Sequence, residues 1–185
     1  AGKVTIEECV IDTNLAKGSS SPYGVVIHCS TGSETNILNT VFNTTLKSGW
    51  KFTDVSGEYF DKFTSYFEDA AGSRYTTNGK DVIYMNGGTL NLENVTFSGS
   101  GISNFINGQA NAGANMNKIN ISGTNNTFAS ASGRAIWNRG VLTFTEGSYA
   151  KFSGGIEIEN NNSNGAVVNF EKDSLVEMKN GIVGT

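Results

Sequence analysis

The chain repeats a short pattern, and this repeat leaves few folds open to it. Six segments begin with alternating apolar residues, pass through a polar stretch and then present a large apolar residue. Aligning the second apolar residue of each segment gives the series Ile6, Ile37, Leu92, Ile121, Phe144 and Phe170. Successive members lie 31, 55, 29, 23 and 26 residues apart, and most of these spacings fit one coil of a solenoid.

Strand periodicity explains why such segments have to stack. In the segment TLNLE at 89–93, apolar and polar residues alternate, so a strand there buries only one face. Ordering its backbone costs about 1–2 kcal/mol per residue, which an isolated strand does not offset. Neighbouring coils therefore supply the hydrogen bonds and the rest of the core, with like residues lying over like residues.

Further apolar runs predict a second and a third strand in each coil. Runs for the second strand lie at 25–29, 81–88, 133–140 and 155–161. Within these runs, the predicted inward residues are Val82, Tyr84, Ala135, Trp137, Ile156 and Ile158. The third strand is predicted to contain Phe97, Phe128, Phe152 and Met178, and Gly87 and Gly88 are predicted to form a turn. The predicted fold class is all-β: a right-handed parallel β-helix with one short helical insertion, formed by residues 1–185 as a single segment.

One part of the chain breaks the repeat. The spacing of 55 between Ile37 and Leu92 exceeds one coil, so residues 43–80 are predicted to be an insertion or a degenerate coil. Aromatic residues recur there at helical offsets, which indicates an amphipathic helix. This helix either covers a side of the solenoid or forms an arm that displays aromatic residues to a sugar or a protein. The predicted binding residues of this arm are Trp50, Phe52, Tyr59 and Tyr66.

Charge and hydropathy narrow the range of partners. The formal net charge is -4 and there is no basic tract, so nucleic acid is not an expected partner. No apolar stretch approaches the roughly 20 residues that span a bilayer, so membrane insertion by this segment is not expected. Repeat arrays normally carry caps at both ends. The first residues, KVTIEE, and the last, NGIVGT, already follow the repeat, which predicts a segment of a longer array.

The cysteines and the single histidine offer little reactive chemistry. Cys9 and Cys29 lie in differently patterned runs, so two free buried thiols and one cross-coil disulfide both remain open. His28 and Cys29 are adjacent in a predicted strand and therefore point to opposite faces, which makes a catalytic pair unfavourable. No metal-ligand spacing surrounds either cysteine, and no metal or cofactor is predicted.

Catalysis by a β-helix requires carboxylates that converge on one outer face of adjacent coils. Glu157 and Glu159 are predicted to face outward beside Arg134 and Arg139 of the preceding coil. A cross-coil salt-bridge cluster explains these four residues better than a catalytic cleft does. The chain is therefore not predicted to be an enzyme, and no catalytic residue is assigned.

Two segments resemble a known family. GRAIWNRGVLTFTEGSYAKFSGG at 133–155 and DVIYMNGGTLNLENVTFSGSG at 81–101 resemble the GGAI and FxxN repeats of polymorphic outer-membrane-protein-type autotransporter passengers. The segments depart from the strict motif, since Arg134 stands beside the expected small residue and FSGS or FSGG replaces FxxN.

This resemblance implies a secreted or cell-surface bacterial protein, part of an outer-membrane passenger, that acts in adhesion. The partner it implies is a host or bacterial surface protein or glycan. The alternative function is that of a carbohydrate-active β-helix, either a relative of polysaccharide lyases and hydrolases or a phage-type receptor-binding rod.

Overall fold

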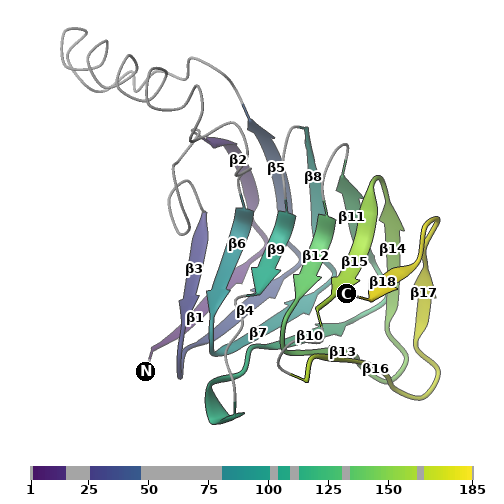
Figure 1. The fold of residues 1–185 in the computed structure, drawn as a ribbon. Coiled ribbons are helices and arrows are strands. Elements are labelled where there is room, and N and C mark those ends of the chain that lie inside the picture. The colour runs from purple at the N-terminus through teal and green to yellow at the C-terminus, as the bar shows by residue number, and fades with distance from the viewer. Residues whose placement is uncertain are drawn as a thin grey trace, which may run out of the picture.

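Each coil of the chain contributes one strand to each of three parallel sheets, and each sheet has six strands. The computed structural model describes residues 2–15, 26–46, 81–100, 104–108, 113–130, 134–161 and 165–184. Figure 1 shows these sheets wound about a common axis as a right-handed parallel β-helix. The predicted β-helix is therefore confirmed in the described part of the chain.

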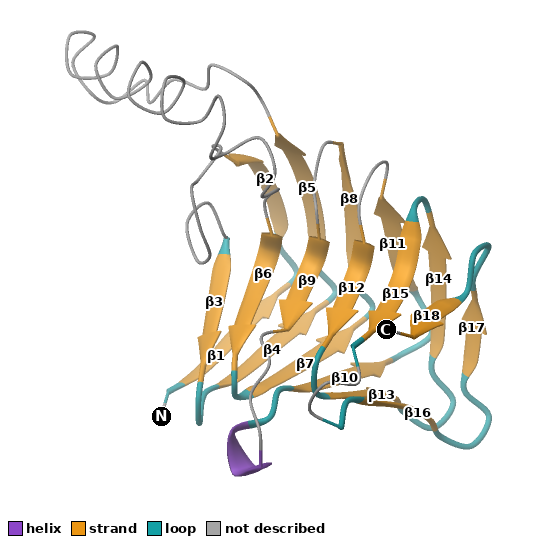
Figure 2. Cartoon of the chain, in the orientation of Figure 1, coloured by secondary structure: helices purple, strands orange, loops and turns teal. Residues whose placement is uncertain are grey.

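In each sheet the strands follow one another along the axis in the order of the chain. Sheet I contains β1 (Lys3–Glu7), β4 (Glu34–Leu38), β7 (Thr89–Glu93), β10 (Lys118–Ser122), β13 (Val141–Phe144) and β16 (Val167–Phe170). Sheet II contains β2 (Val10–Leu15), β5 (Val41–Leu46), β8 (Thr96–Ser100), β11 (Asn126–Ser130), β14 (Tyr149–Ser153) and β17 (Leu175–Glu177). Sheet III contains β3 (Ile27–Ser30), β6 (Asp81–Asn86), β9 (Asn104–Gly108), β12 (Arg134–Asn138), β15 (Ile156–Asn160) and β18 (Ile182–Gly184). A short 3-10 helix, η1 (Gly113–Asn115), is drawn in purple in Figure 2.

The predicted series of stacked residues is confirmed in sheet I. Its six members are direct partners from strand to strand: Ile6, Ile37, Leu92, Ile121, Phe144 and Phe170. The middle four side chains are fully buried, whereas Phe170 in the last coil is 50% exposed. The repeat thus encodes one column of the core, which continues through every coil.

Sheet II adds a column of stacked aromatic rings. Phe42 lies 4.7 Å from Phe97 between ring centroids, Phe97 lies 5.3 Å from Phe128, and Phe128 lies 4.6 Å from Phe152. Their planes differ by no more than 11°, because parallel, in-register strands place equivalent side chains directly over one another. The predicted third strand is therefore confirmed for Phe97, Phe128 and Phe152, whereas Met178 lies just after β17 and packs against the core.

Sheet III carries a column of isoleucines, and its faces differ from the predicted ones. Ile27, Ile83, Ile106, Ile136, Ile158 and Ile182 are partners in successive strands. The residue before each central isoleucine is buried as well, as Val82, Phe105 and Ala135 are. Two consecutive residues thus face the interior, so strict alternation fails in this sheet.

This local break in alternation corrects the predictions for Trp137 and Ile156. Val82, Ala135 and Ile158 do belong to the core. Tyr84 is buried, at 8% exposed, without joining the main apolar cluster. Trp137 is only partly buried and lies outside that cluster, and Ile156 is 38% exposed. The alignment that placed them inside equated Trp137 with Ile158, whereas the ladder pairs Ile136 with Ile158. A shift of one residue exchanges the faces of a strand.

The first four residues of the predicted insertion or degenerate coil, 43–80, lie in a strand. Strand β5 runs from Val41 to Leu46 and pairs with β8 as far as Thr45, so residues 43–46 continue a regular coil. The remaining positions, 47–80, lie outside the described residues, and the amphipathic helix there stays a prediction. In the described part of the chain, no helix is long and apolar enough to cross a membrane.

The turn between β6 and β7 requires glycine at two consecutive positions. Gly87 and Gly88 have φ values of 92° and 82°, in the left-handed region that side chains rarely adopt. A Cβ atom on Gly88 would lie 2.6 Å from the carbonyl oxygen of Ser30 and 2.8 Å from that of Ser33. The backbone of the preceding coil therefore leaves no room for a side chain at this turn, as the predicted role of the two glycines requires.

Candidate functional site

The break in alternation places the first and fourth residues of the four middle strands of sheet III, β6, β9, β12 and β15, on the same side. Because the second and third residues of these strands both pack inward, their first and fourth residues gather into one polar and aromatic group. We call this group the sheet III cluster. It comprises Asp81, Tyr84, Asn104, Asn107, Arg134, Trp137, Arg139 and Glu159.

Asp81 fixes the two amides of the cluster. The Nδ2 atom of Asn104 donates to Asp81 Oδ1 and that of Asn107 donates to Asp81 Oδ2, each at 2.7 Å. A carboxylate accepts hydrogen bonds only, so both NH2 groups must face Asp81. This requirement fixes the orientation of both amides and directs their carbonyl oxygens away from the carboxylate.

Trp137 stands at the centre of the basic part of the cluster. The guanidinium carbon of Arg139 lies 3.5 Å from the centroid of its ring, and that of Arg134 lies 4.6 Å away. Arg134 Nε also donates to a carboxylate oxygen of Glu159 in the next coil. Cation–π contacts and the ion pair together hold the indole and both guanidinium groups in place.

Three polar atoms of the cluster are buried without a hydrogen-bond partner. They are Asn104 Oδ1, Asn107 Oδ1 and Trp137 Nε1. Asn104 is only 4% exposed and Asn107 6%, yet each side chain satisfies only its NH2 group. Buried polar atoms normally have partners, because leaving one unpaired costs about 1–3 kcal/mol. Three such atoms on partner residues of β9 and β12 make the cluster a candidate binding site.

The electrostatics of the cluster centre on Arg139. Burial lowers the pKa of its guanidinium below the usual value, Glu159 opposes this shift, and the like charge of Arg134 adds to it. The side chain stays charged at neutral pH, since an arginine begins far above that range. Arg134 has Glu159 as a direct partner, whereas Arg139 makes its described contact with the ring of Trp137.

The predicted salt-bridge cluster is confirmed for Arg134 and Glu159, which pair across coils. The prediction for Glu157 is wrong. Glu157 is buried and accepts hydrogen bonds from the backbone N–H groups of Lys179 at 2.8 Å, Asn180 at 2.6 Å and Gly181 at 2.8 Å. It occupies the second position of β15, which faces inward in this sheet, and it ties the turn before β18 to β15.

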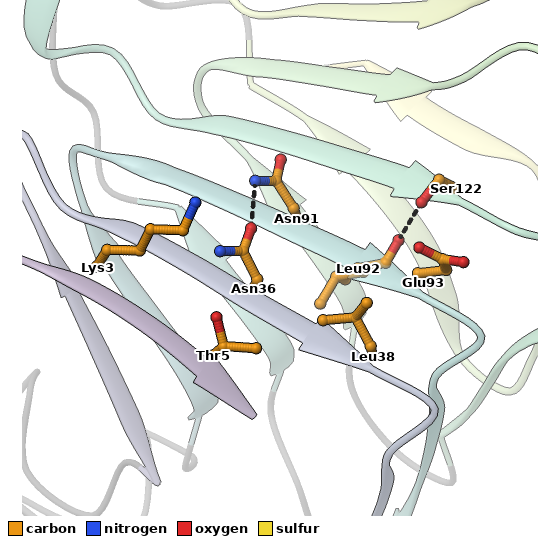
Figure 3. A pocket seen from close by; sticks show the side chains of 8 residues that line it. All are labelled: Lys3, Thr5, Asn36, Leu38, Asn91, Leu92, Glu93 and Ser122. Atoms are coloured by element: carbon orange, nitrogen blue, oxygen red, sulfur yellow. Dashed lines mark hydrogen bonds between the residues drawn. The ribbon is translucent and has the colours of Figure 1, made fainter. Parts of the chain in front are cut away.

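A shallow hollow on the outer face of sheet I is a second candidate, shown in Figure 3. Its volume is about 310 Å³, and its lining residues are Lys3, Thr5, Asn36, Leu38, Asn91, Leu92, Glu93 and Ser122. Four of its lining residues are joined in pairs by hydrogen bonds. Asn91 Nδ2 donates to Asn36 Oδ1 at 2.8 Å, and Ser122 Oγ donates to the carbonyl oxygen of Leu92 at 3.2 Å.

This hollow belongs to a ladder of amides and hydroxyls that follows the axis. Partners in successive strands of sheet I are Thr5, Asn36, Asn91, Asn120, Thr143 and Asn169. Asn120 Nδ2 donates to Asn91 Oδ1 at 2.8 Å, which extends the chain of hydrogen bonds. The ladder stabilises the stacking of coils. The sheet III cluster, with its unpaired atoms, is the stronger candidate for binding.

Both cysteines are free: Cys29 is buried and Cys9 is partly exposed. Cys29 lies in the core while His28 is exposed on the other side of β3, as the adjacent positions predict. Burial raises the pKa of the Cys29 thiol, although its hydrogen bond with Thr35 opposes the shift. Both effects of burial, a small thiolate fraction and poor access, make Cys29 unreactive.

Thiol labelling tests this difference. We expect Cys9 to react with a disulfide reagent in the native protein and Cys29 to react only after unfolding, so that native labelling at neutral pH stops at one equivalent. Cys9→Ser is the control and should abolish native labelling. Rapid modification of both thiols in the folded chain would contradict the burial of Cys29.

The remaining predicted site residues are not placed. Trp50, Phe52, Tyr59 and Tyr66 lie outside the described residues, so the binding arm stays a prediction. Within the described ranges, no group of three or more His, Cys, Asp or Glu side chains is arranged to hold a metal ion. Comparison with known protein families, with curated proteins and with solved structures finds no match to this chain.

Proposed function

We propose that this chain is the binding rod of a cell-surface adhesin, a secreted or outer-membrane passenger that recognises a host or bacterial surface protein or glycan. The observation that carries this proposal is the sheet III cluster. It brings together, on one side of sheet III, an indole ring, two guanidinium groups and two buried, unpaired amide oxygens. Tryptophan, tyrosine and arginine are the residues that most often dominate the energy of recognition.

The scaffold favours recognition because it holds these groups rigidly. The cluster draws on β6, β9, β12 and β15, four successive strands that are hydrogen-bonded in parallel register. Asp81 fixes the amides and Glu159 fixes Arg134, so few side chains have to become ordered on binding. Such preorganisation reduces the entropic cost of association.

The carboxylates of the cluster favour binding over catalysis. Both oxygens of Asp81 accept hydrogen bonds from amides, and Glu159 is paired with Arg134. A general acid or nucleophile has to reach its substrate directly. The carbohydrate-active alternative predicts instead that new reducing ends or unsaturated products accumulate when the chain is incubated with polysaccharides.

Replacing Trp137 by alanine tests the proposed surface. We expect Trp137→Ala to weaken binding to cells or immobilised glycans by about tenfold or more, because a central aromatic anchor typically contributes 2 kcal/mol or more. Flow cytometry with the labelled chain, or biolayer interferometry, measures the loss. Thr143→Ala on the outer face of sheet I is the matched control and should bind like the unmodified chain.

Two outcomes would contradict the proposal. Equal binding by Trp137→Ala and the unmodified chain would place recognition elsewhere, and product release from polysaccharides would favour the enzyme. A chain lacking residues 50–75 tests the predicted aromatic arm separately. Circular dichroism of each variant establishes that the β-helix is retained.

A further inference from the structure

We propose that the ligand of the sheet III cluster is a carboxylated glycan, in which Arg139 binds the carboxylate and the carbonyl oxygens of Asn104 and Asn107 accept sugar hydroxyl groups. This inference rests on the proposed binding function and names the ligand class for the same surface. It follows from the groups that the cluster leaves unsatisfied.

The amide oxygens require hydrogen-bond donors. Asp81 holds both NH2 groups, so Asn104 Oδ1 and Asn107 Oδ1 are left as acceptors, and both are buried without a partner. The two side chains come from the same strand, three residues apart, and both reach Asp81. The hydroxyl groups of a sugar ring supply such donors.

The basic side of the cluster requires an acceptor. Asn107 and Trp137 are direct partners in β9 and β12, as are Asn104 and Arg134, so the acceptors lie one strand away from the indole and a guanidinium group. The guanidinium carbon of Arg139 lies over the ring of Trp137, and Arg139 makes no ion pair among the described residues. A guanidinium group presents a fork of N–H donors that matches a carboxylate. Trp137 Nε1 is an additional buried donor without a partner.

Only some ligands combine these features. The cluster offers acceptors for hydroxyl groups beside a cationic fork and an aromatic ring within one small surface. A sugar acid carries hydroxyl groups and a carboxylate on one ring, whereas a neutral sugar leaves Arg139 without an anion. Phosphate or sulfate alone leaves the two amide oxygens without donors.

The chain provides its own reporter for the test. It contains two tryptophans, so an emission change that is present in the unmodified chain and lost in Trp137→Phe comes from Trp137. Oligogalacturonate and sialyllactose are the acidic probes, and carboxyl-reduced oligogalacturonate and lactose are their neutral counterparts. Fluorescence titration follows binding close to Trp137, and calorimetry measures binding to the whole chain. Circular dichroism checks that each variant is folded.

We expect an acidic probe to change the emission of Trp137 and to bind about tenfold or more tightly than its neutral counterpart, as expected for a hydrogen-bonded charge pair. Arg139→Gln should remove that preference, and Arg139→Lys should restore part of it. Asn107→Ala should weaken the binding of both the acidic and the neutral probes. Lys118→Gln removes one positive charge from sheet I and should leave binding unchanged.

The failures of the two proposals are distinguishable. Equal affinity for acidic and neutral glycans would overturn the carboxylate assignment and leave glycan recognition intact. Acidic glycans that bind without affecting Trp137, or equally well to Arg139→Gln, would overturn the site. Binding to cells that depends on Trp137, without binding to any glycan, would identify a protein partner and overturn this inference alone. Loss of both kinds of binding would overturn both proposals.

Discussion

Replacing Phe97 by alanine is expected to lower the free energy of unfolding by about 3–5 kcal/mol, the cost of removing a large aromatic side chain from a packed core. Phe97 is fully buried at the middle of the sheet II stack. Its ring contacts those of Phe42, Phe128 and Phe105, with centroids 4.7, 5.3 and 5.5 Å away. The substitution leaves a cavity bordered by three successive coils.

The repeat architecture makes this position more sensitive than one near an end. In a solenoid, stability is close to a sum of terms for each coil and for each interface between coils. Phe97 contributes to interfaces on both sides, so its removal weakens two of them. Denaturation with urea, followed by circular dichroism, measures the change. Thr96→Ala, at the neighbouring outward position, is the control and should cost less than about 1 kcal/mol.

A small effect of Phe97→Ala would show that the stacked rings do not hold the coils together. Phe97→Leu refines the measurement, because leucine fills part of the cavity and should recover part of the loss. If leucine and alanine are equally destabilising, ring stacking rather than filled volume determines the stability of this column.

The core of sheets I and II could be predicted from the sequence because each strand there alternates strictly. The alignment of Ile6 with Ile37 and of Leu92 with Ile121 needed only a period of two and one coil length. The spacing of 55 residues between Ile37 and Leu92 also indicated an interruption of the repeat. Strand β5 nevertheless extends to Leu46, four residues into the predicted interruption.

Sheet III could not be predicted in the same way, because two consecutive residues face inward. A signal was nevertheless present in the sequence. Each strand or its approach contains isoleucine as the third residue of a four-residue unit: VVIH, DVIY, NFIN, RAIW, IEIE and NGIV. Aligning these units on isoleucine, rather than on alternation, would have placed Trp137 outside the core and revealed the missed strand at 104–108.

The same alignment identifies the candidate site. The first and fourth residues of three consecutive units are Asp and Tyr, Asn and Asn, and Arg and Trp, which are the outer residues of β6, β9 and β12. Their contacts depend on which strands are neighbours, and β6, β9 and β12 are neighbours because each coil returns to the same sheet. The unpaired state of the amide oxygens depends on the hydrogen bonds of Asp81, which no sequence pattern specifies.

Buried asparagines at the turns between strands are a second feature that the apolar repeat does not predict. Asn126 offers the clearest test of what such a residue contributes to stability. It is fully buried at the start of β11. Its Oδ1 accepts from the backbone N–H of Val95 at 3.1 Å in the preceding coil. Its Nδ2 donates to the carbonyl oxygens of Ser122 at 2.8 Å and, in the following coil, of Tyr149 at 2.9 Å. One side chain thus joins three coils.

We expect Asn126→Ala to destabilise the chain by about 2–4 kcal/mol, because it removes several hydrogen bonds and leaves the N–H of Val95 buried without a partner. Urea denaturation measures the loss, and amide hydrogen exchange should locate it at Val95. Asn125→Ala is the matched control: this neighbouring asparagine is exposed, and only its backbone N–H bonds to Asn94 Oδ1. Equal effects of the two substitutions would mean that the corner amide contributes nothing specific to coil stacking. A larger effect of Asn126→Ala would show that the turns, as well as the apolar columns, hold successive coils in register.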